Sequence, residues 1–265
     1  MYLRTENLTI GYAHTQVQTG LNLQVQAGNF ICMLGRNGCG KSTLLRTIAG
    51  LQPPIAGRVS ICHESEEIDL TVVSAAAKSR LLALVLTEHL SVDNTRVREV
   101  VAMGRYPYTD FLGALSDADN RIIDEAISEV GISQKADSYF NELSDGEKQR
   151  VMIAKSLAQQ TPVILLDEPT SFLDLPNRIK TMLLLRRLAH EQQKIIITST
   201  HEHELALQEA DTLWLMQPGN GIIVGSPQRL IESKAFQTAF QDDSFSFESV
   251  DGDLKLRLKT DWHDN

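Results

Sequence analysis

The sequence has no uninterrupted run of the roughly 18 apolar residues that a membrane-spanning helix needs. Any role at a membrane would therefore have to come through a partner protein. The N-terminal segment MYLRTENLTI does not have the pattern of a secretory signal peptide. Internal repeats and low-complexity segments are also missing, which excludes solenoid and fibrous classes.

Cysteine and basic residues are both scarce. The three cysteines, Cys32, Cys39 and Cys62, cannot all pair and lack metal-ligand spacing, which is typical of a reducing cytosol. Lys and Arg number 25 against 34 Asp and Glu, and the net charge of −9 gives no electrostatic case for a nucleic-acid partner. With 265 residues, of which 42% are hydrophobic, the chain can form one large domain or a domain with a smaller lobe.

The most informative stretch is residues 35–42, GRNGCGKS, which fits the phosphate-loop pattern G-x-x-x-x-G-K-[ST]. The apolar run at 30–34 predicts a buried strand before it, and residues 43–51 predict a helix after it. In this context, backbone N–H groups and the helix N-terminus form a cradle for phosphate. A glycine-rich turn that binds nothing is the alternative, and the agreement of pattern and context disfavours it.

We expect this loop to bind a nucleoside triphosphate. Lys41 would reach the β- and γ-phosphates, and the Ser42 hydroxyl would ligate Mg²⁺. In an acidic chain the positive field must be local, from Lys41, Arg36 and backbone dipoles. For Cys39 we favour a small tolerated residue over a redox sensor. The expected nucleotide-binding residues of the loop are Gly35, Arg36, Asn37, Gly38, Cys39, Gly40, Lys41, Ser42 and Thr43.

Two carboxylates follow the apolar strand predicted at 163–166. Asp167 and Glu168 then lie at the carboxyl edge of a parallel sheet, where ligands bind in open α/β folds. We predict that Asp167 holds Mg²⁺ and that Glu168 acts as the general base toward the attacking water. A simple transition from strand to turn is the alternative. The strand predicted at 194–200 ends at the same edge with His201.

Further elements follow from periodicity. Strands are predicted at 3–11, 57–61, 81–86, 212–216 and 222–224, and surface loops at 13–20 and 63–69. Residues 95–140 are mainly helical and depart from the alternation of strand and helix. Helices are also expected from 144 to about 159, from 176 to 192 and from 204 to 209, and a β-hairpin at 245–258. Ser144 and Glu147 form a capping-box pattern, which is also an anion site.

The whole set resembles the ATP-binding subunit of an ABC transporter. GRNGCGKS resembles its Walker A motif, VILLDE its Walker B motif, LSDGE its signature, SFLD at 171–174 its D-loop, and His201 its switch histidine. The resemblance covers roughly residues 1–230 and implies an α/β fold: a phosphate-loop NTPase core with a mixed sheet, an N-terminal antiparallel β subdomain and an inserted helical subdomain. The expected domains are an ATPase domain at 1–240, with helical residues at about 95–160, and a β-hairpin extension at 241–265.

The resemblance also implies a head-to-tail homodimer with ATP at the interface. Tyr12 would stack on adenine, Ser144 and Gly146 would contact the γ-phosphate bound to the other copy, and His201 would hydrogen-bond the γ-phosphate. Without the phosphate loop, Tyr12 would be explained as a strand-end aromatic that covers the core. ATP and Mg²⁺ are the expected cofactors.

Two positions depart from the family pattern. The family has a glutamine after the strand at 81–86, whereas this sequence has Thr87, Glu88 and His89. Glu88 could serve as a metal ligand through an oxygen. Asp145 and Glu147 stand where the family has glycine and glutamine. Because a carboxylate facing the γ-phosphate would repel it, we expect Asp145 to point away and Glu147 to serve the helix cap.

The stretch VREVVAMGRYPYTD at 97–110 resembles the importers of iron–siderophore, haem and cobalamin, whose helical lobe carries a similar segment on its surface and receives a coupling helix of the permease. A solvent-exposed helix break is the alternative. The implied function is import of a metal chelate, driven by ATP hydrolysis at the cytoplasmic face of the inner membrane. The expected partners are permease subunits, a second copy and, indirectly, a substrate-binding protein. The alternatives are a soluble ABC-type ATPase acting on nucleic acid or ribosomes, and a regulatory module without turnover.

Overall fold

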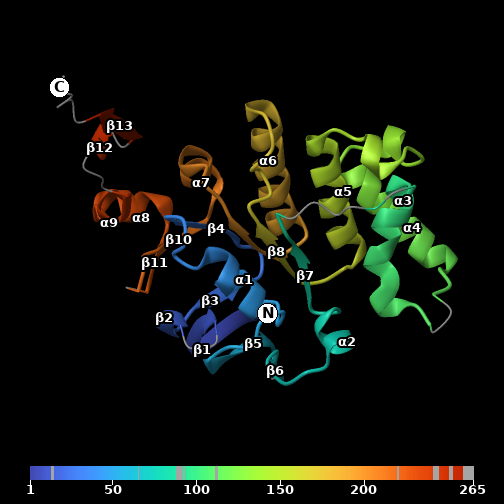
Figure 1. Ribbon diagram of the computed structural model, residues 1–265, viewed down its shortest axis with the longest axis horizontal. Coiled ribbons are helices and arrows are strands. Elements are labelled where there is room, and N and C mark those ends of the chain that lie inside the picture. Colours follow the sequence, from blue (N-terminus) through green and yellow to red (C-terminus); the bar gives the residue numbers. More distant parts are fainter. Residues whose placement is uncertain are drawn as a thin grey trace.

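A computed structural model of the chain describes residues 1–12, 15–64, 66–87, 92, 94–110, 113–219, 221–240, 245–250 and 253–258. In this described part, the central sheet has the strand order β11-β10-β4-β9-β8-β7 (Figure 1). Its strands are β4 (Phe30–Gly35), β7 (Leu82–Val85), β8 (Val163–Asp167), β9 (Ile195–Ser199), β10 (Thr212–Met216) and β11 (Ile222–Gly225). The pairs from β7 to β10 are parallel and β11 is antiparallel, so the sheet is mixed, as predicted.

A second sheet is antiparallel and comes from the N-terminal part of the chain. Its strands are β1 (Tyr2–Tyr12), β2 (Thr15–Leu21), β3 (Gln24–Gln26), β5 (Ala56–His63) and β6 (Glu66–Asp69). The predicted loops at 13–20 and 63–69 were therefore wrong for most of their length. In β2 only residues 18 and 21 are buried, and β6 has three acidic residues and no buried one, so neither has a clear apolar alternation.

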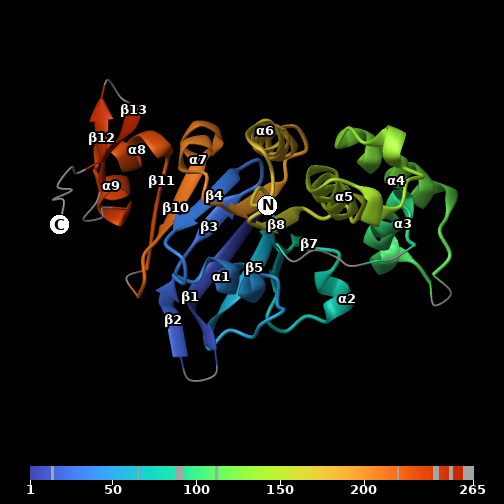
Figure 2. The same cartoon turned by 45° about the horizontal axis from the view of Figure 1, so that its top comes forward.

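The helices of the first half follow the predicted positions with shorter bounds. Helix α1 (Lys41–Ile48) follows the phosphate loop, and α2 (Ala75–Lys78) is a short turn that the sequence analysis missed. The segment at 95–159 forms a helical lobe, which lies beyond the β7 edge of the sheet in Figures 1 and 2. The helices of this lobe are α3 (Val97–Ala102), η1 (Met103–Tyr108), α4 (Asp117–Glu129), η2 (Ser133–Lys135), η3 (Phe140–Glu142) and α5 (Asp145–Ala158).

Alternate residues of β4 enter two different hydrophobic cores. Phe30, Cys32 and Leu34 face the core that contains the helical lobe, α6 (Leu175–Glu191) and α7 (His203–Glu209). Ile31 and Met33 face the core that contains α1 and the antiparallel sheet. The phosphate loop leaves β4 between these two layers, so both of its flanking elements are fixed by buried contacts.

The C-terminal part begins with two short helices, α8 (Pro227–Glu232) and α9 (Ala235–Phe240), which the sequence analysis missed. The cap of α8 was a usable signal, because Ser226 accepts from the Arg229 N–H and Pro227 occupies the first turn. The predicted hairpin is confirmed as β12 (Phe245–Val250) and β13 (Asp253–Leu258). It lies at the end of the molecule opposite the helical lobe (Figure 2). None of the helices in the described ranges is both long and apolar enough to cross a membrane.

Candidate functional site

The phosphate loop adopts a backbone that needs glycine. Gly38 and Gly40 have φ of 77° and 108°, in the region that side chains rarely adopt. Gly35 needs to be small for another reason: a Cβ there would lie 2.6 Å from the Cys39 Sγ and 2.6 Å from the Met216 carbonyl oxygen. Gly40 is the N-cap of α1 and has no side chain to occupy the first-turn N–H groups, which leaves the helix N-terminus open as an anion site.

The Lys41 ammonium is held over this loop. Its Nζ donates to the Gly35 carbonyl at 2.8 Å and lies 3.5 Å from the Arg36 carbonyl. The residue is only 6% exposed, so water screens its positive charge little and the charge acts mainly on the loop. Because an ammonium has three donors and no acceptor, a phosphate oxygen can replace these carbonyl partners.

A hydroxyl and a carboxylate meet beside the loop. The Ser42 hydroxyl donates to Asp167 Oδ1 at 3.0 Å, which joins the start of α1 to the end of β8. Asp167 is buried, as expected for a side chain that closes a parallel strand at the sheet edge. Mg²⁺ prefers oxygen ligands. This pair offers two of them, the Ser42 hydroxyl and the charged Asp167 carboxylate. The residues present therefore fit this ion. Glu88, the third predicted ligand, lies outside the described residues.

Ser199 completes this arrangement and was missed in the sequence. Its hydroxyl donates to Asp167 Oδ1 at 2.7 Å and accepts from the Glu168 N–H at 2.9 Å. The Thr87 hydroxyl donates to the Asp167 carbonyl at 2.7 Å, so two neighbouring strand ends orient the same residue. Ser199 is the register partner of Asp167, and a serine at the end of the neighbouring parallel strand was the available signal.

Glu168 and His201 lie in contact, as two side chains at the same sheet edge. His201 Nε2 and Glu168 Oε1 are 2.8 Å apart, and because a carboxylate only accepts, Nε2 carries the proton. The Ser171 hydroxyl donates to Glu168 Oε2 at 3.0 Å. Glu168 has a φ of 49°, a left-handed conformation that costs a residue with a side chain about 1–2 kcal/mol. The strained backbone occurs at the residue whose carboxylate contacts His201 and Ser171.

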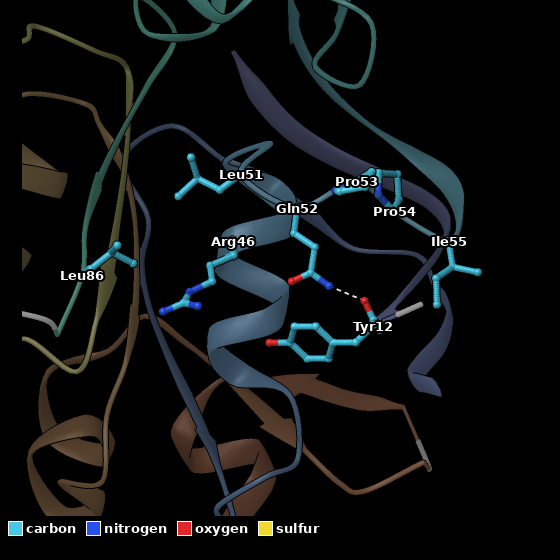
Figure 3. A pocket seen from close by; sticks show the side chains of 9 residues that line it. Tyr12, Arg46, Leu51, Gln52, Pro53, Pro54, Ile55 and Leu86 are labelled. Carbon is cyan, nitrogen blue, oxygen red and sulfur yellow. Dashed lines mark hydrogen bonds between the residues drawn. The ribbon is translucent and has the colours of Figure 1, made fainter. Parts of the chain in front are cut away.

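Tyr12 ends β1 beside the start of α1. Its hydroxyl lies 3.1 Å from the Thr43 hydroxyl, and 53% of the residue is exposed. The ring borders a cavity of about 760 Å³ (Figure 3). The cavity is lined by Gly11, Tyr12, Arg46, Leu51, Gln52, Pro53, Pro54, Ile55 and Leu86. An exposed ring next to the helix that follows the phosphate loop can stack on a base without displacing core residues.

The predicted helix cap at Ser144 is confirmed. The Ser144 N–H donates to Glu147 Oε2 at 3.0 Å, and the Glu147 N–H donates back to the Ser144 hydroxyl. The bonds from the Ser144 N–H and hydroxyl lower the pKa of Glu147, helped by Lys135. The Asp145 side chain is 55% exposed and lies 4.0 Å from Lys148 Nζ. In the described chain the hydrogen bonds of the Ser144 N–H and hydroxyl stay within this helix start, and Gly146 lies in its first turn.

The segment at 103–108 is not the exposed helix break that was the alternative explanation. Arg105 is buried and its Nε donates to Asp119 Oδ1 at 2.7 Å. Its guanidinium also donates to the Ala158 carbonyl and lies 4.1 Å from the centre of the Tyr108 ring. Arg105 therefore fastens η1 to α4 and to the end of α5. Tyr106 remains on the outside with 62% of its surface exposed.

We expect Arg105→Ala to lower the free energy of unfolding by about 3 kcal/mol, because it leaves the buried Asp119 carboxylate without its charged partner. Arg98→Ala is the control: it breaks an exposed pair with Asp124 in the same lobe, which costs under about 1 kcal/mol. Urea unfolding measures both. Equal losses would contradict the structural role of Arg105.

The same pair predicts a pH dependence. Hydrogen bonds from the Ser116 hydroxyl and N–H, followed by Arg105, lower the pKa of Asp119 from 3.8 to about 2. A lowered carboxyl pKa contributes stability that is present above the ordinary value and is lost as the pH falls through the folded value. The difference in stability between the wild type and Arg105→Ala should therefore shrink between pH 4 and pH 2.

Comparison with known proteins gives a consistent result. A family model described as ABC transporter matches residues 18–171. An uncharacterized ABC transporter ATP-binding protein of Methanocaldococcus jannaschii is 38% identical, over 96% of this chain and 87% of that protein. The ferric enterobactin transport ATP-binding protein of Escherichia coli is 32% identical, over 90% of this chain and 86% of that protein. The solved structure of a metal-chelate type ABC transporter in an inward-facing conformation matches with a TM-score of 0.79 and 25% identity, over 97% of this chain and 96% of that chain.

Proposed function

The chain belongs to the ABC transporter family, and from this premise we propose that it is the ATP-hydrolysing subunit that energises import of a metal chelate through a membrane permease. The observation that carries the proposal is the meeting of Lys41, Ser42, Asp167, Glu168 and His201 at one edge of the central sheet. The relatives that carry ferric enterobactin and metal chelates in their names support the class of cargo.

In this proposal, the loop residues 35–43 bind the phosphates of ATP. Gly38 and Gly40 let the backbone N–H groups approach, and Lys41 exchanges its carbonyl partners for phosphate oxygens. Tyr12 stacks on adenine with its exposed ring. Arg36 and Thr43, near the two ends of this segment, would add further contacts to the phosphates.

Ser42 and Asp167 would hold Mg²⁺, through the two oxygens that now lie 3.0 Å apart. When bound, this ion offsets the negative charge of the phosphate oxygens. Ser199 holds the Asp167 carboxylate and Thr87 holds the Asp167 backbone carbonyl, so hydrogen bonds orient the residue that would hold the ion.

Glu168 is the proposed general base, which takes a proton from the water that attacks the γ-phosphate. Both of its oxygens are engaged in this structure, one by His201 and one by Ser171. The two partners fix the direction of the carboxylate, and release of either oxygen gives the water an acceptor. His201 then donates to the γ-phosphate with the Nε2–H that Glu168 now accepts.

A second copy of the chain completes the site. The start of α5, with Ser144 and Gly146, presents the positive end of a 14-residue helix, which suits the γ-phosphate bound to the other copy. Hydrolysis is then coupled to association of the two copies, and the permease receives the change through the helical lobe. We place the complex at the cytoplasmic face of the inner membrane, with a substrate-binding protein as an indirect partner.

Co-purification of the chain with its permease, followed by reconstitution in liposomes, tests this function. The expected result is accumulation of an iron chelate that requires ATP. ATP hydrolysis by a chain that binds no membrane protein and responds instead to nucleic acid or ribosomes would overturn the proposal in favour of a soluble ATPase.

A further inference from the structure

Strand β2 carries a buried polar side chain next to the phosphate loop. Gln18 has 0% exposure, although most residues of this edge strand are exposed. Its Nε2 donates to the Cys39 carbonyl at 3.1 Å and to the Gln217 carbonyl at 2.5 Å, and its Oε1 accepts from the Gly221 N–H at 3.0 Å. One amide group thus joins β2, the phosphate loop and the turn after β10.

The orientation of this amide follows from its partners. Both neighbours of Nε2 are carbonyl oxygens and the neighbour of Oε1 is an N–H, so the opposite orientation would create three repulsive contacts. Both donors of the Gln18 amide are used. A buried amide that is satisfied in this way fixes the groups that it contacts.

The bond to Cys39 has a geometric consequence for the loop. A trans peptide is planar, so its C=O and N–H point in opposite directions. Because Gln18 holds the Cys39 carbonyl toward β2, the Gly40 N–H points away from β2. Val17, the neighbour of Gln18, also packs on this peptide: a Cβ on Gly40 would lie 2.5 Å from Val17 Cγ1. Strand β2 therefore determines the direction of an N–H group at the open start of α1.

We propose that Gln18 is a positioning residue for ATP binding: it orients the Cys39–Gly40 peptide so that the Gly40 N–H faces the phosphates. The inference rests on the proposed function of the loop. Gln18 acts through the loop backbone, and it couples that backbone to the β10–β11 turn through Gln217 and Gly221.

The test replaces Gln18 by Met, which keeps the length and approximate volume of the side chain and removes all three hydrogen bonds. We expect KM for ATP to rise by about tenfold, the equivalent of one lost hydrogen bond, while kcat changes by less than about twofold. Thr5→Val is the matched control. Thr5 is also buried and its hydroxyl bonds two backbone groups, the Leu21 carbonyl and the Leu23 N–H, neither of which belongs to the phosphate loop.

A purely structural role of Gln18 predicts that both variants lose thermal stability and leave KM unchanged, and this result would overturn the inference. Gln18→Leu provides a second variant if Gln18→Met does not fold, because it removes the same three hydrogen bonds with a smaller apolar side chain and places no charge beside the Cys39 and Gln217 carbonyls. Hydrogen exchange of the amides at 38–42 without nucleotide should speed up in both Gln18 variants and not in Thr5→Val. If the wild type itself binds no ATP, the proposed function fails, which is a distinct outcome.

Discussion

Replacement of Glu168 by Gln should reduce steady-state ATP hydrolysis by at least about 100-fold and leave ATP affinity within about twofold. The amide keeps the size of the side chain and can still bond to His201 and Ser171, but it cannot take a proton from water. Because the nucleotide is then bound and not consumed, the two-copy complex should accumulate. Phosphate release measures turnover, and size-exclusion chromatography with ATP measures the dimer.

Glu202→Gln is the control for this variant. Glu202 lies at the same edge of the sheet, and its carboxylate is already paired with Arg178 at 2.7 Å. Its replacement should leave turnover almost unchanged. Undiminished hydrolysis in Glu168→Gln would remove Glu168 from its proposed role.

Replacement of Lys41 by Ala should weaken ATP binding by at least about 100-fold, the second large effect that we expect. The ammonium is the buried charged donor held over the loop, and its loss leaves the backbone N–H groups and the exposed Arg36 for the phosphates. Isothermal titration calorimetry with ATP and Mg²⁺ measures the affinity directly.

Lys194→Ala is the matched control for Lys41→Ala. Lys194 also donates to a backbone carbonyl, that of Thr161 at 2.7 Å, but it lies at the opposite edge of the sheet, at the start of β9. Burial lowers the pKa of this lysine. Its replacement should keep ATP affinity, and equal affinity in the Lys41 variant would contradict the proposed phosphate loop.

The sequence alone predicted those elements in which a local motif and a regular apolar pattern occur in the same short stretch. The strand before Gly35, the helix after it and the cap at Ser144 each depend on local residues, so a short window predicts them. The position of His201 at the same sheet edge as Asp167 followed from two parallel strands that end there, whereas the contact between His201 and Glu168 came only from the structure. The α/β class followed from the alternation of apolar strands and helical spacing along the core, whereas the mixed sheet and the antiparallel subdomain were expected from the family resemblance.

Long-range contacts account for what the sequence did not reveal. Strand β2 was taken for a loop because Gln18 occupies an inward position, and its partners lie as far away as Gly221. Ser199 needed the register of β8 and β9 before it could be assigned to Asp167. The sequence analysis assigned residues 97–110 to the surface of the helical lobe, and the buried position of Arg105 was evident only with α4 and α5 placed around it.

The backbone of Glu168 has a consequence for any attempt to improve this protein by directed evolution. A left-handed φ of 49° is conformationally free for glycine and costly for glutamate, so the position is a local weakness of the folded chain. A library sorted for heat resistance alone would be enriched in glycine at 168, and the most robust survivors would have lost the carboxylate. Selection for heat resistance therefore favours glycine at position 168, whereas selection for ATP hydrolysis favours glutamate there.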